Sequence, residues 1–338
     1  MTESLLDLDR LNAYLQSQLP HLNRIECAEK FNNGQSNPTF LLSGESGQLV
    51  LRRQPPGELL KSAHAVDREY RVIKALQDSR VPVPRALHLC VDRDVIGSLF
   101  FLMSFEAGQI FWDPTLPDLD VAGRAAIYSE LNRVLAALHS VDVEAVGLAD
   151  FGRPGDYFER QISRWSRQYR ACETETIPAM NRLIDWLPQH LPADDGQVSL
   201  IHGDFRIDNI VFMQTGNTAR ALLDWELSTL GHPYADLAYQ CMQWRVSRDA
   251  VIPGLGDLDR QSIGIPSEQD YVAEYCARRG LDSIDHWNFY LAFSFFRMAA
   301  ILQGVLKRAL DGNASSTRAL EYGALAPELA AMALELTD

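Results

Sequence analysis

The chain has 338 residues, enough for one large or two medium domains, and 46% of them are hydrophobic, which provides for a sizeable core. A net charge of -14 argues against general binding to nucleic acid, and no apolar run approaches the roughly 18 residues of a membrane span. The five cysteines are scattered and never spaced as Cys-x-x-Cys, so neither a zinc site nor a disulfide framework is expected. The start of the chain lacks the basic region of a signal peptide, and we therefore expect a cytoplasmic protein with reduced thiols.

The first third of the chain has the pattern of a small sheet with two helices. Apolar residues at helical spacing predict a helix over residues 5–19, which ends before Pro20, and a second helix over 61–77. Short runs of strand-forming residues predict five strands, over 24–31, 39–43, 48–53, 85–91 and 99–104.

The remainder of the chain is mostly helical in pattern. Helices are predicted over 123–139, 156–170, 177–190, 234–244, 267–279, 284–310 and 317–336. A sheet-rich first third followed by helices predicts an α+β fold with two lobes, residues 1–105 and residues 106–338, joined by a hinge near 103–108.

The most informative segment lies among these helices and carries Asp204, Asn209 and Asp224. An apolar run leads to Asp204, a second begins after Asn209, and a third ends at Asp224. Asn209 and Asp224 lie at equal sequence distance from the predicted turn at Gly216-Asn217, so a hairpin there would place them opposite each other. Their oxygens could then share a hard cation such as Mg²⁺, and Asp204 could orient or deprotonate a hydroxyl. Such a set of residues is typical of a phosphoryl-transfer site.

The order His-Gly-Asp-x-x-x-x-Asn followed by a later Asp resembles the aminoglycoside phosphotransferase and choline kinase-like family, relatives of the protein kinases. The resemblance implies that Asp204 is the catalytic base and that Asn209 and Asp224 hold Mg²⁺, with ATP or another NTP as co-substrate. It also implies a bilobal protein kinase-like fold, with a small antiparallel-sheet lobe for the nucleotide and a mainly helical lobe for catalysis and acceptor binding. We interpret His202 as a scaffold, and the neighbouring Asp208 and Glu226 as structural or solvated.

The resemblance places the nucleotide contacts in the first lobe. A turn over residues 33–39 can direct backbone N–H groups at phosphates, which makes Gly34, Ser36 and Asn37 candidate contacts. At the hinge, Ser104 and Phe105 are candidate contacts as well.

One strand of this lobe offers a basic residue for the phosphates. Arg52 stands where the family places its phosphate-binding Lys, with Arg53 as the alternative, and a guanidinium can bind phosphate with two parallel hydrogen bonds. Glu69 resembles the helix glutamate that pairs with that basic residue.

The acceptor is indicated by a basic stripe. Arg160, Arg164 and Arg167 share one face of a predicted helix and could bind an anionic acceptor, although a solvated face paired with nearby carboxylates is the alternative. Four stretches resemble the branch of the family fused to some acyl-CoA dehydrogenases: residues 51–57, 157–165, 224–231 and 296–304. The resemblance extends over about residues 31–308.

Three further residues are interpreted separately. His232 stands where that branch usually has Asp, and its effect stays open. Asp236 is interpreted as structural, and Arg297 as a buried partner for a carboxylate such as Asp236.

The sequence therefore predicts a phosphotransferase that moves the terminal phosphate of ATP or another NTP to a small-molecule hydroxyl. Branch and charge favour a hydroxy acid or hydroxyacyl thioester as acceptor. The alternatives are a nucleotide-binding pseudokinase that acts as a regulatory module, and a kinase of the aminoglycoside or choline type. We expect no nucleic-acid or membrane partner. The acceptor's identity, the preference for ATP or GTP, and the oligomeric state stay open.

Overall fold

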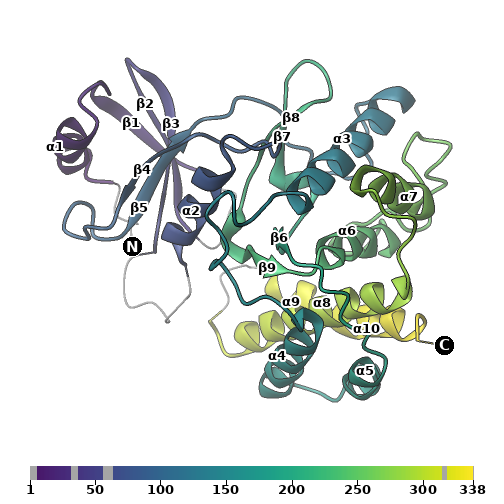
Figure 1. Cartoon of the computed structure of the whole chain (residues 1–338). Helices are drawn as coiled ribbons and strands as arrows, with labels where there is room; N and C mark the ends of the chain where they lie inside the picture. The colour runs from purple at the N-terminus through teal and green to yellow at the C-terminus, as the bar shows by residue number, and fades with distance from the viewer. Residues whose placement is uncertain (1–5, 32–36, 56–63, 314–317, 338) are drawn as a thin grey trace. The chain divides into compact units, whose positions relative to one another are not determined.

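The computed structural model describes residues 6–31, 37–55, 64–313 and 318–337. The chain divides into two compact units: residues 1–108 with 220–226, and residues 109–219 with 227–338 (Figure 1). The boundary thus falls at 108 rather than the expected 105, and the segment 220–226 groups with the first unit. Two contacts explain this grouping, because the Leu222 N–H donates to the Pro82 carbonyl at 2.8 Å and Arg220 pairs with Glu106 at 2.6 Å.

The first unit is built on a five-stranded antiparallel sheet in the order β1-β2-β3-β5-β4. Its elements are α1 (Leu8–Gln18), β1 (Ile25–Lys30), β2 (Thr39–Gly44), β3 (Gly47–Arg53), α2 (Val66–Leu76), β4 (Ala86–Cys90) and β5 (Phe100–Ser104). The five predicted strands are therefore confirmed, and α1 lies against β1 (Figure 1).

Apolar side chains of α1 and the sheet form the core of this unit. Leu11 and Leu15 of α1 are buried in one cluster with Leu42, Leu51 and Phe100. Burial of such a side chain stabilises the fold by roughly 1.5–3 kcal/mol.

Both helices of the first unit begin later than the sequence predicted. α1 begins after Asp7, whose carboxylate caps the helix by accepting from the Arg10 N–H at 3.0 Å. α2 begins only at Val66, because His64 has a left-handed backbone with φ of 59° that a helix cannot include. The predicted residues 61–63 lie outside the described part of the chain.

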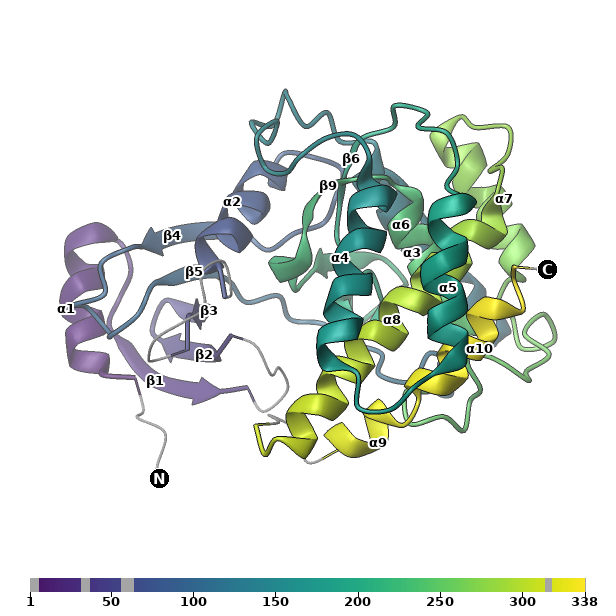
Figure 2. The ribbon, with the colours of Figure 1, turned by 90° about the horizontal axis from the view of Figure 1, so that it is seen from below.

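The second unit is mainly helical. Its helices are α3 (Val121–His139), α4 (Tyr157–Cys172), α5 (Pro178–Gln189), α6 (Tyr234–Arg245), α7 (Glu268–Arg279), α8 (Trp287–Leu310), α9 (Ala319–Gly323) and α10 (Ala326–Leu334). α8 packs against α4, α6, α9 and α10, and Figure 2 shows α4, α5 and α10 beside it. By length and composition α8 could cross a membrane, but 83% of its most apolar window is buried inside the protein, as in the core helix of a globular unit.

Two helix predictions in this unit differ from the structure. The helix predicted over 284–310 begins at Trp287, because His286 is left-handed with φ of 56°. The helix predicted over 317–336 is two helices, and Pro327 lies in the first turn of the second, where its missing N–H costs nothing. At the end of α9, Gly323 lies so close to α8 that a Cβ would come within 2.4 Å of the Leu306 Cβ, so only glycine fits.

Short elements surround the predicted phosphoryl-transfer motif. β6 (Ser199–Ile201) pairs antiparallel with β9 (Thr229–Gly231), and β7 (Ile210–Phe212) forms a two-stranded sheet with β8 (Ala219–Leu222). The Met213 N–H donates to the Thr218 carbonyl at 2.9 Å and closes the predicted turn. Single turns of 3-10 helix, Ile207–Asn209 and Trp225–Leu227, lie just after Asp204 and Asp224 in the chain.

Candidate active site

A buried carboxylate fixes the backbone of the loop that carries Asp204. Asp236, in the first turn of α6, accepts the N–H groups of His202 at 2.6 Å and Gly203 at 2.8 Å, and its Oδ2 lies 3.4 Å from His139 Nε2. Burial acts to raise the pKa of Asp236, but the hydrogen bond with His139 and the backbone N–H bonds hold that pKa below its usual value. Asp236 is therefore structural, as the sequence predicted.

Gly203 is the tightest point of this loop. Its φ is +84°, and a Cβ there would lie 2.7 Å from the Leu227 carbonyl oxygen. Both the backbone angle and the space exclude a side chain, which explains the glycine of the motif. His202 is fully buried and its Nδ1 accepts the Asp204 N–H at 3.3 Å, in keeping with a scaffold role.

The Asp204 carboxylate is held by uncharged hydrogen-bond donors. The Tyr239 hydroxyl donates to Oδ1 at 2.8 Å, and the Asn209 amide donates to Oδ2 at 3.2 Å and to the Asp204 carbonyl at 2.9 Å. The Asp204 side chain keeps 24% of its surface exposed, and Arg206 Nε lies 3.9 Å from Oδ1. The carboxylate is thus oriented and still accessible.

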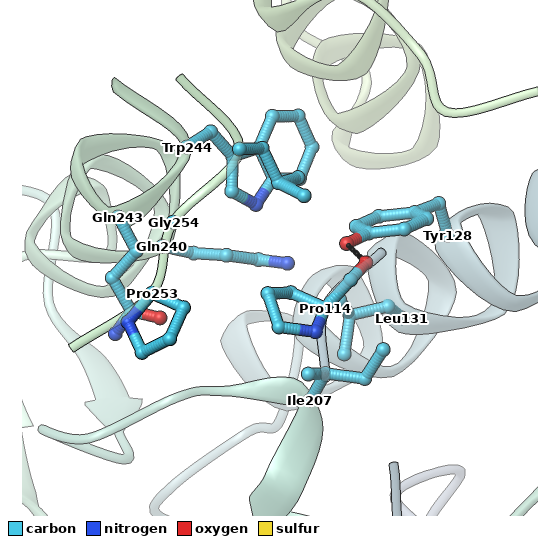
Figure 3. Close-up of a pocket in the computed structure, with 10 residues that line it drawn as sticks. Pro114, Tyr128, Leu131, Ile207, Gln240, Gln243, Trp244, Pro253 and Gly254 are labelled. Atoms are coloured by element: carbon cyan, nitrogen blue, oxygen red, sulfur yellow. Dashed lines mark hydrogen bonds between the residues drawn. The ribbon is translucent and has the colours of Figure 1, made fainter. Parts of the chain in front are cut away.

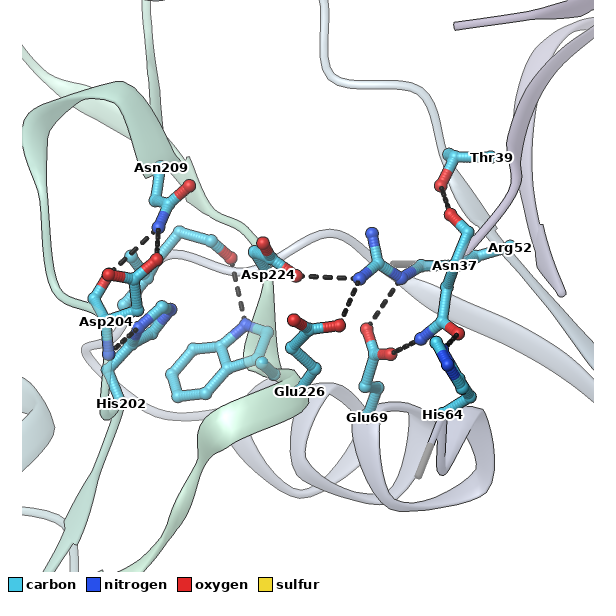
Figure 4. Close-up of polar contacts among 12 residues, drawn as sticks. Asn37, Thr39, Arg52, His64, Glu69, His202, Asp204, Asn209, Asp224 and Glu226 are labelled. Carbon is cyan, nitrogen blue, oxygen red and sulfur yellow. Dashed lines mark hydrogen bonds and ion pairs between the residues drawn. The ribbon is translucent and has the colours of Figure 1, made fainter. Parts of the chain in front are cut away.

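The Asn209 amide is oriented by the same contacts. Because both of its hydrogen bonds to Asp204 use Nδ2, the carbonyl oxygen points away from Asp204 (Figure 4). That oxygen is a ligand of the kind that Mg²⁺ prefers. Arg206 pairs with Asp208, so Asp208 has a structural ion pair near the loop.

In the first unit, Arg52 lies among three carboxylates (Figure 4). Its Nε is 2.8 Å from Glu69 Oε2, and its Nη2 is 2.7 Å from Asp224 Oδ1 and 3.6 Å from Glu226 Oε2. The cluster carries more negative than positive formal charge. We call these four residues the Arg52 cluster. The sequence found three of its members but interpreted Glu226 as structural or solvated.

Arg53 points to the other side of β3. It is buried, donates to the Ile96 carbonyl at 3.4 Å and lies 5.9 Å from the Phe40 ring centre. Of the two alternatives left open by the sequence, the structure thus places Arg52 beside Glu69.

Glu69 is the most deeply buried member of the cluster, with 2% of its surface exposed. Its Oε1 accepts from Asn37 Nδ2 at 2.7 Å, and Asn37 Oδ1 in turn lies 3.0 Å from His64 Nδ1. Burial raises the pKa of Glu69 to about 7, against the opposing effect of Arg52, and the negative charges of Asp224 and Glu226 add to the rise. The Asn37 side chain therefore donates a hydrogen bond to Glu69. The sequence predicted Asn37 only as a backbone contact to phosphate and did not indicate this role.

Asp224 has an unusual backbone for a residue with a side chain. Its φ is 64°, in the left-handed region, which costs a residue with a side chain roughly 1–3 kcal/mol. Its side chain is 36% exposed. The expected pairing of Asp224 with Asn209 around one cation stays a prediction.

The remaining nucleotide candidates are less informative. Gly34 and Ser36 lie outside the described residues. Ser104 ends β5, where its hydroxyl accepts the Arg85 N–H at 2.8 Å and donates to Glu106 Oε1 at 2.5 Å. Phe105 follows it and is half-buried.

The basic stripe on α4 is not uniform. Arg160 donates hydrogen bonds to the Gly155 carbonyl and, at 2.6 Å, to the Arg153 carbonyl. It therefore holds the loop that precedes α4 in place. Arg164 and Arg167 are exposed; Arg164 lies 5.3 Å from the Trp165 ring centre and Arg167 donates to the Ser163 carbonyl at 3.3 Å. Only two of the three predicted arginines therefore present an accessible charge.

Arg297 has a different partner from the one predicted. It donates to the Gly203 carbonyl at 2.8 Å, and no ion pair joins it to Asp236 within the described residues. The prediction was wrong because α8 is buried around most of its circumference, so sequence periodicity does not tell which neighbour a polar residue reaches.

His232, whose effect the sequence left open, has a structural place. Its Nε2 lies 3.2 Å from Asp195 Oδ1, and its ring stacks on Tyr290 with centroids 5.7 Å apart. Burial lowers the pKa of His232, although Asp195 acts to raise it.

One small cavity of the second unit lies next to the loop (Figure 3). Its volume is about 20 Å³, and Ile207, Gln240 and Trp244 are among the residues that line it. The Nε2 of Gln240 has no hydrogen-bond partner among the described residues. The space suits a single water and is too small for an acceptor molecule.

Comparisons with known proteins show what the chain is similar to. The model of the phosphotransferase enzyme family matches residues 28–271. Acyl-CoA dehydrogenase family member 10 of Mus musculus is 50% identical over 327 residues, which cover 96% of this chain and 30% of that protein. The chain spans less than half the length of the curated relatives that it matches, from 30% to 43%.

Solved structures show the same fold. The crystal structure of a candidate aminoglycoside phosphotransferase from Ralstonia eutropha is 46% identical, covers 98% of both chains and has a TM-score of 0.91. Aminoglycoside phosphotransferase APH(4)-Ia, solved with AMP-PNP and hygromycin B, has a TM-score of 0.63 at 13% identity, with 96% of this chain and 98% of that chain covered. The predicted kinase-like α+β fold is therefore confirmed.

Proposed function

This chain belongs to the phosphotransferase enzyme family, and we propose that it moves the terminal phosphate of ATP, or of another NTP, to a hydroxyl of a small acyl-type molecule. The observation that carries the proposal is the Asp204 carboxylate, which is partly exposed and oriented by Tyr239 and Asn209. A carboxylate held in this way can accept the proton of an acceptor hydroxyl.

We assign the phosphate-binding role to Arg52 and the supporting role to Glu69. Arg52 has two guanidinium edges, and Glu69 engages Nε while Nη2 faces the more exposed Asp224. A nucleotide phosphate would compete with Asp224 for that edge, since a guanidinium binds phosphate oxygens readily.

The residues present fit Mg²⁺. No cluster of three or more His, Cys, Asp or Glu side chains that could hold a metal occurs in the described parts of the chain. Mg²⁺ does not require one, because it is usually bound by one or two protein oxygens together with substrate phosphates and water. Asp224 and Asn209 would supply those two oxygens, and the ion would neutralise phosphate charge as transfer proceeds.

The proposed step conserves atoms and charge. The acceptor oxygen attacks the terminal phosphorus, the bond from that phosphorus to the bridging oxygen breaks, and the nucleoside diphosphate leaves with the bonding electrons. Asp204 takes the hydroxyl proton. Arg52 stays with the phosphates that remain on the nucleotide.

The acceptor class rests on two observations. Curated relatives carry the name acyl-CoA dehydrogenase, which connects this branch with acyl chemistry. Arg164 and Arg167 present exposed positive charge, which suits an anionic group. We therefore favour a hydroxy acid or a hydroxyacyl thioester over a cationic aminoglycoside or choline.

A test measures ADP release with wild type and Asp204→Asn on hydroxy acids, hydroxyacyl thioesters, choline and an aminoglycoside. We expect Mg²⁺-dependent turnover on the first two classes, and its loss in the variant. Turnover on choline or the aminoglycoside alone would refute the acceptor class. No turnover on any acceptor, with intact Mg²⁺-dependent ATP binding, would favour the pseudokinase alternative.

A further inference from the structure

Tyr239 forms a direct contact with the proposed base. Its hydroxyl lies 2.8 Å from Asp204 Oδ1, and only 4% of the residue is exposed. Burial raises the pKa of Tyr239 far above its ordinary value, and the charge of Asp204 raises it further, so the hydroxyl keeps its proton. It therefore donates to Asp204 and does not accept from it.

A second buried residue fixes the Tyr239 ring. The Arg297 guanidinium lies 5.4 Å from the Tyr239 ring centre and 5.8 Å from that of Trp165, within the range of a cation–π contact. The same guanidinium donates to the Gly203 carbonyl at 2.8 Å. Arg297 thus connects three helices, α4, α6 and α8, to the residue that precedes Asp204.

From these contacts we infer that Tyr239 is a positioning residue for phosphoryl transfer. Its hydroxyl holds Asp204 Oδ1 in place, Asn209 holds Oδ2, and the stack of Trp165, Arg297 and Tyr239 sets the direction of that hydroxyl. The inference rests on the proposed role of Asp204 as base.

A purely structural role would need only the ring. At this buried position of α6, a phenylalanine ring would pack as well as the tyrosine ring. The hydroxyl, however, points at a carboxylate that is 24% exposed, accepts one further hydrogen bond from the Asn209 amide and has Arg206 Nε at 3.9 Å. Removing the hydroxyl therefore distinguishes a packing role of the ring from a positioning role of the hydroxyl.

The matched pair of variants is Tyr239→Phe and Tyr128→Phe. Tyr128 is 1% exposed and donates to the Pro114 carbonyl at 2.6 Å, so its variant loses a buried hydroxyl from the same unit without touching Asp204. A hydrogen bond to a charged group is worth enough to lower kcat about 10- to 100-fold in Tyr239→Phe, while the nucleotide KM should change less than about two-fold. Tyr128→Phe should keep kcat within about two-fold of wild type.

Crystal structures of wild type and Tyr239→Phe supply a readout that needs no acceptor. The Asp204 carboxylate should have one orientation in wild type and should rotate or occupy several in the variant. An unchanged Asp204 orientation, or an unchanged kcat, would overturn the inference. If wild type phosphorylates no acceptor, the proposed function fails, and the two crystal structures alone decide the role of Tyr239.

Discussion

The Arg52 cluster and the surroundings of Asp204 differ in how they stabilise carboxylate charge. In the first unit, one guanidinium faces three carboxylates, and two of these, on Asp224 and Glu226, are partly exposed. In the second unit, the Asp204 carboxylate receives hydrogen bonds from neutral groups, Tyr239 and Asn209. The first arrangement has negative charge to share with a cation, whereas the second keeps one carboxylate in a defined orientation.

The difference suggests that the two regions have different roles, one in binding and one in the rate of transfer. Excess carboxylate charge destabilises the cluster unless a cation is close. We therefore expect the contacts within the Arg52 cluster to change when Mg²⁺ and a nucleotide bind. Neutral donors orient a carboxylate without weakening it as a base as much as a close cation would, and Arg206 Nε lies 3.9 Å from Asp204 Oδ1. Variants in one region should therefore affect binding and stability, and variants in the other should affect the rate.

The largest effect should follow from Asp204→Asn. The variant should keep the fold and nucleotide binding but lose turnover by a factor of about 10² to 10⁴, because a positioned base contributes that much. Steady-state kinetics on an active acceptor measures it. Asp208→Asn is the matched control, since Asp208 pairs with Arg206 and should matter much less. Wild-type turnover in Asp204→Asn would show that the base is assigned to the wrong residue.

Arg52→Met should have the next largest effect, on stability. It leaves Glu69 buried without its cationic partner, which costs about 3–5 kcal/mol when the carboxylate stays charged. Uptake of a proton by Glu69 would reduce that loss. Urea denaturation of Arg52→Met and of the double variant Arg52→Met/Glu69→Leu measures the difference. The double variant should have a higher unfolding free energy than Arg52→Met alone. A still lower value would mean that Arg52 does not stabilise the fold through its pairing with Glu69.

Glu69 should make stability depend on pH. Its pKa is raised from 4.5 to about 7 on folding, so the folded chain holds a proton that the unfolded chain has released between these values. Stability from this group is present at the acidic end of that window and is lost as the pH rises through about 7.

The matched variant is Glu69→Gln, which has no proton to lose. From pH 5 to pH 7, the unfolding free energy of wild type relative to Glu69→Gln should fall, by on the order of 1–3 kcal/mol. Denaturant titrations at several pH values measure this difference. A difference that does not fall over the same interval would mean that Glu69 stays charged throughout.

The smallest effect should follow from Arg164→Gln combined with Arg167→Gln. Exposed charges contribute roughly 0.2–1 kcal/mol each, so the acceptor KM should rise only a few-fold, about 2- to 10-fold, at low salt. The effect should shrink in added salt, since the screening length is about 8–10 Å near physiological ionic strength. The ATP KM should not change. Equal acceptor KM values for wild type and variant would remove the anion-site hypothesis.

The sequence predicted the positions that depend on local pattern. The strands of the first unit follow from short apolar runs, and Asp204, Asn209 and Asp224 follow from motif order and the turn between them. The sequence does not give the distance of Asp224 from the other two residues, because Asp224 belongs to the first unit and they belong to the second.

Residues that act through distant contacts were harder to predict. Tyr239 was missed because an aromatic residue within a predicted helix has the pattern of a core residue, although it lies one turn after Asp236 on the same helix. Arg297 was given the wrong partner because its helix is buried on nearly all sides. The left-handed His64 and His286 make two helices begin later than predicted. Histidine adopts this conformation more often than most residues, but too rarely to predict it at a given position.

Binding of AMP-PNP with and without Mg²⁺ tests the different roles of the two regions most directly. Isothermal titration calorimetry would compare wild type, Asp224→Ala, Glu226→Ala and Asp204→Asn. We predict that Mg²⁺ strengthens binding to wild type, Glu226→Ala and Asp204→Asn, and that this gain is lost in Asp224→Ala alone. An undiminished gain in Asp224→Ala, or its loss in Asp204→Asn, would contradict the account.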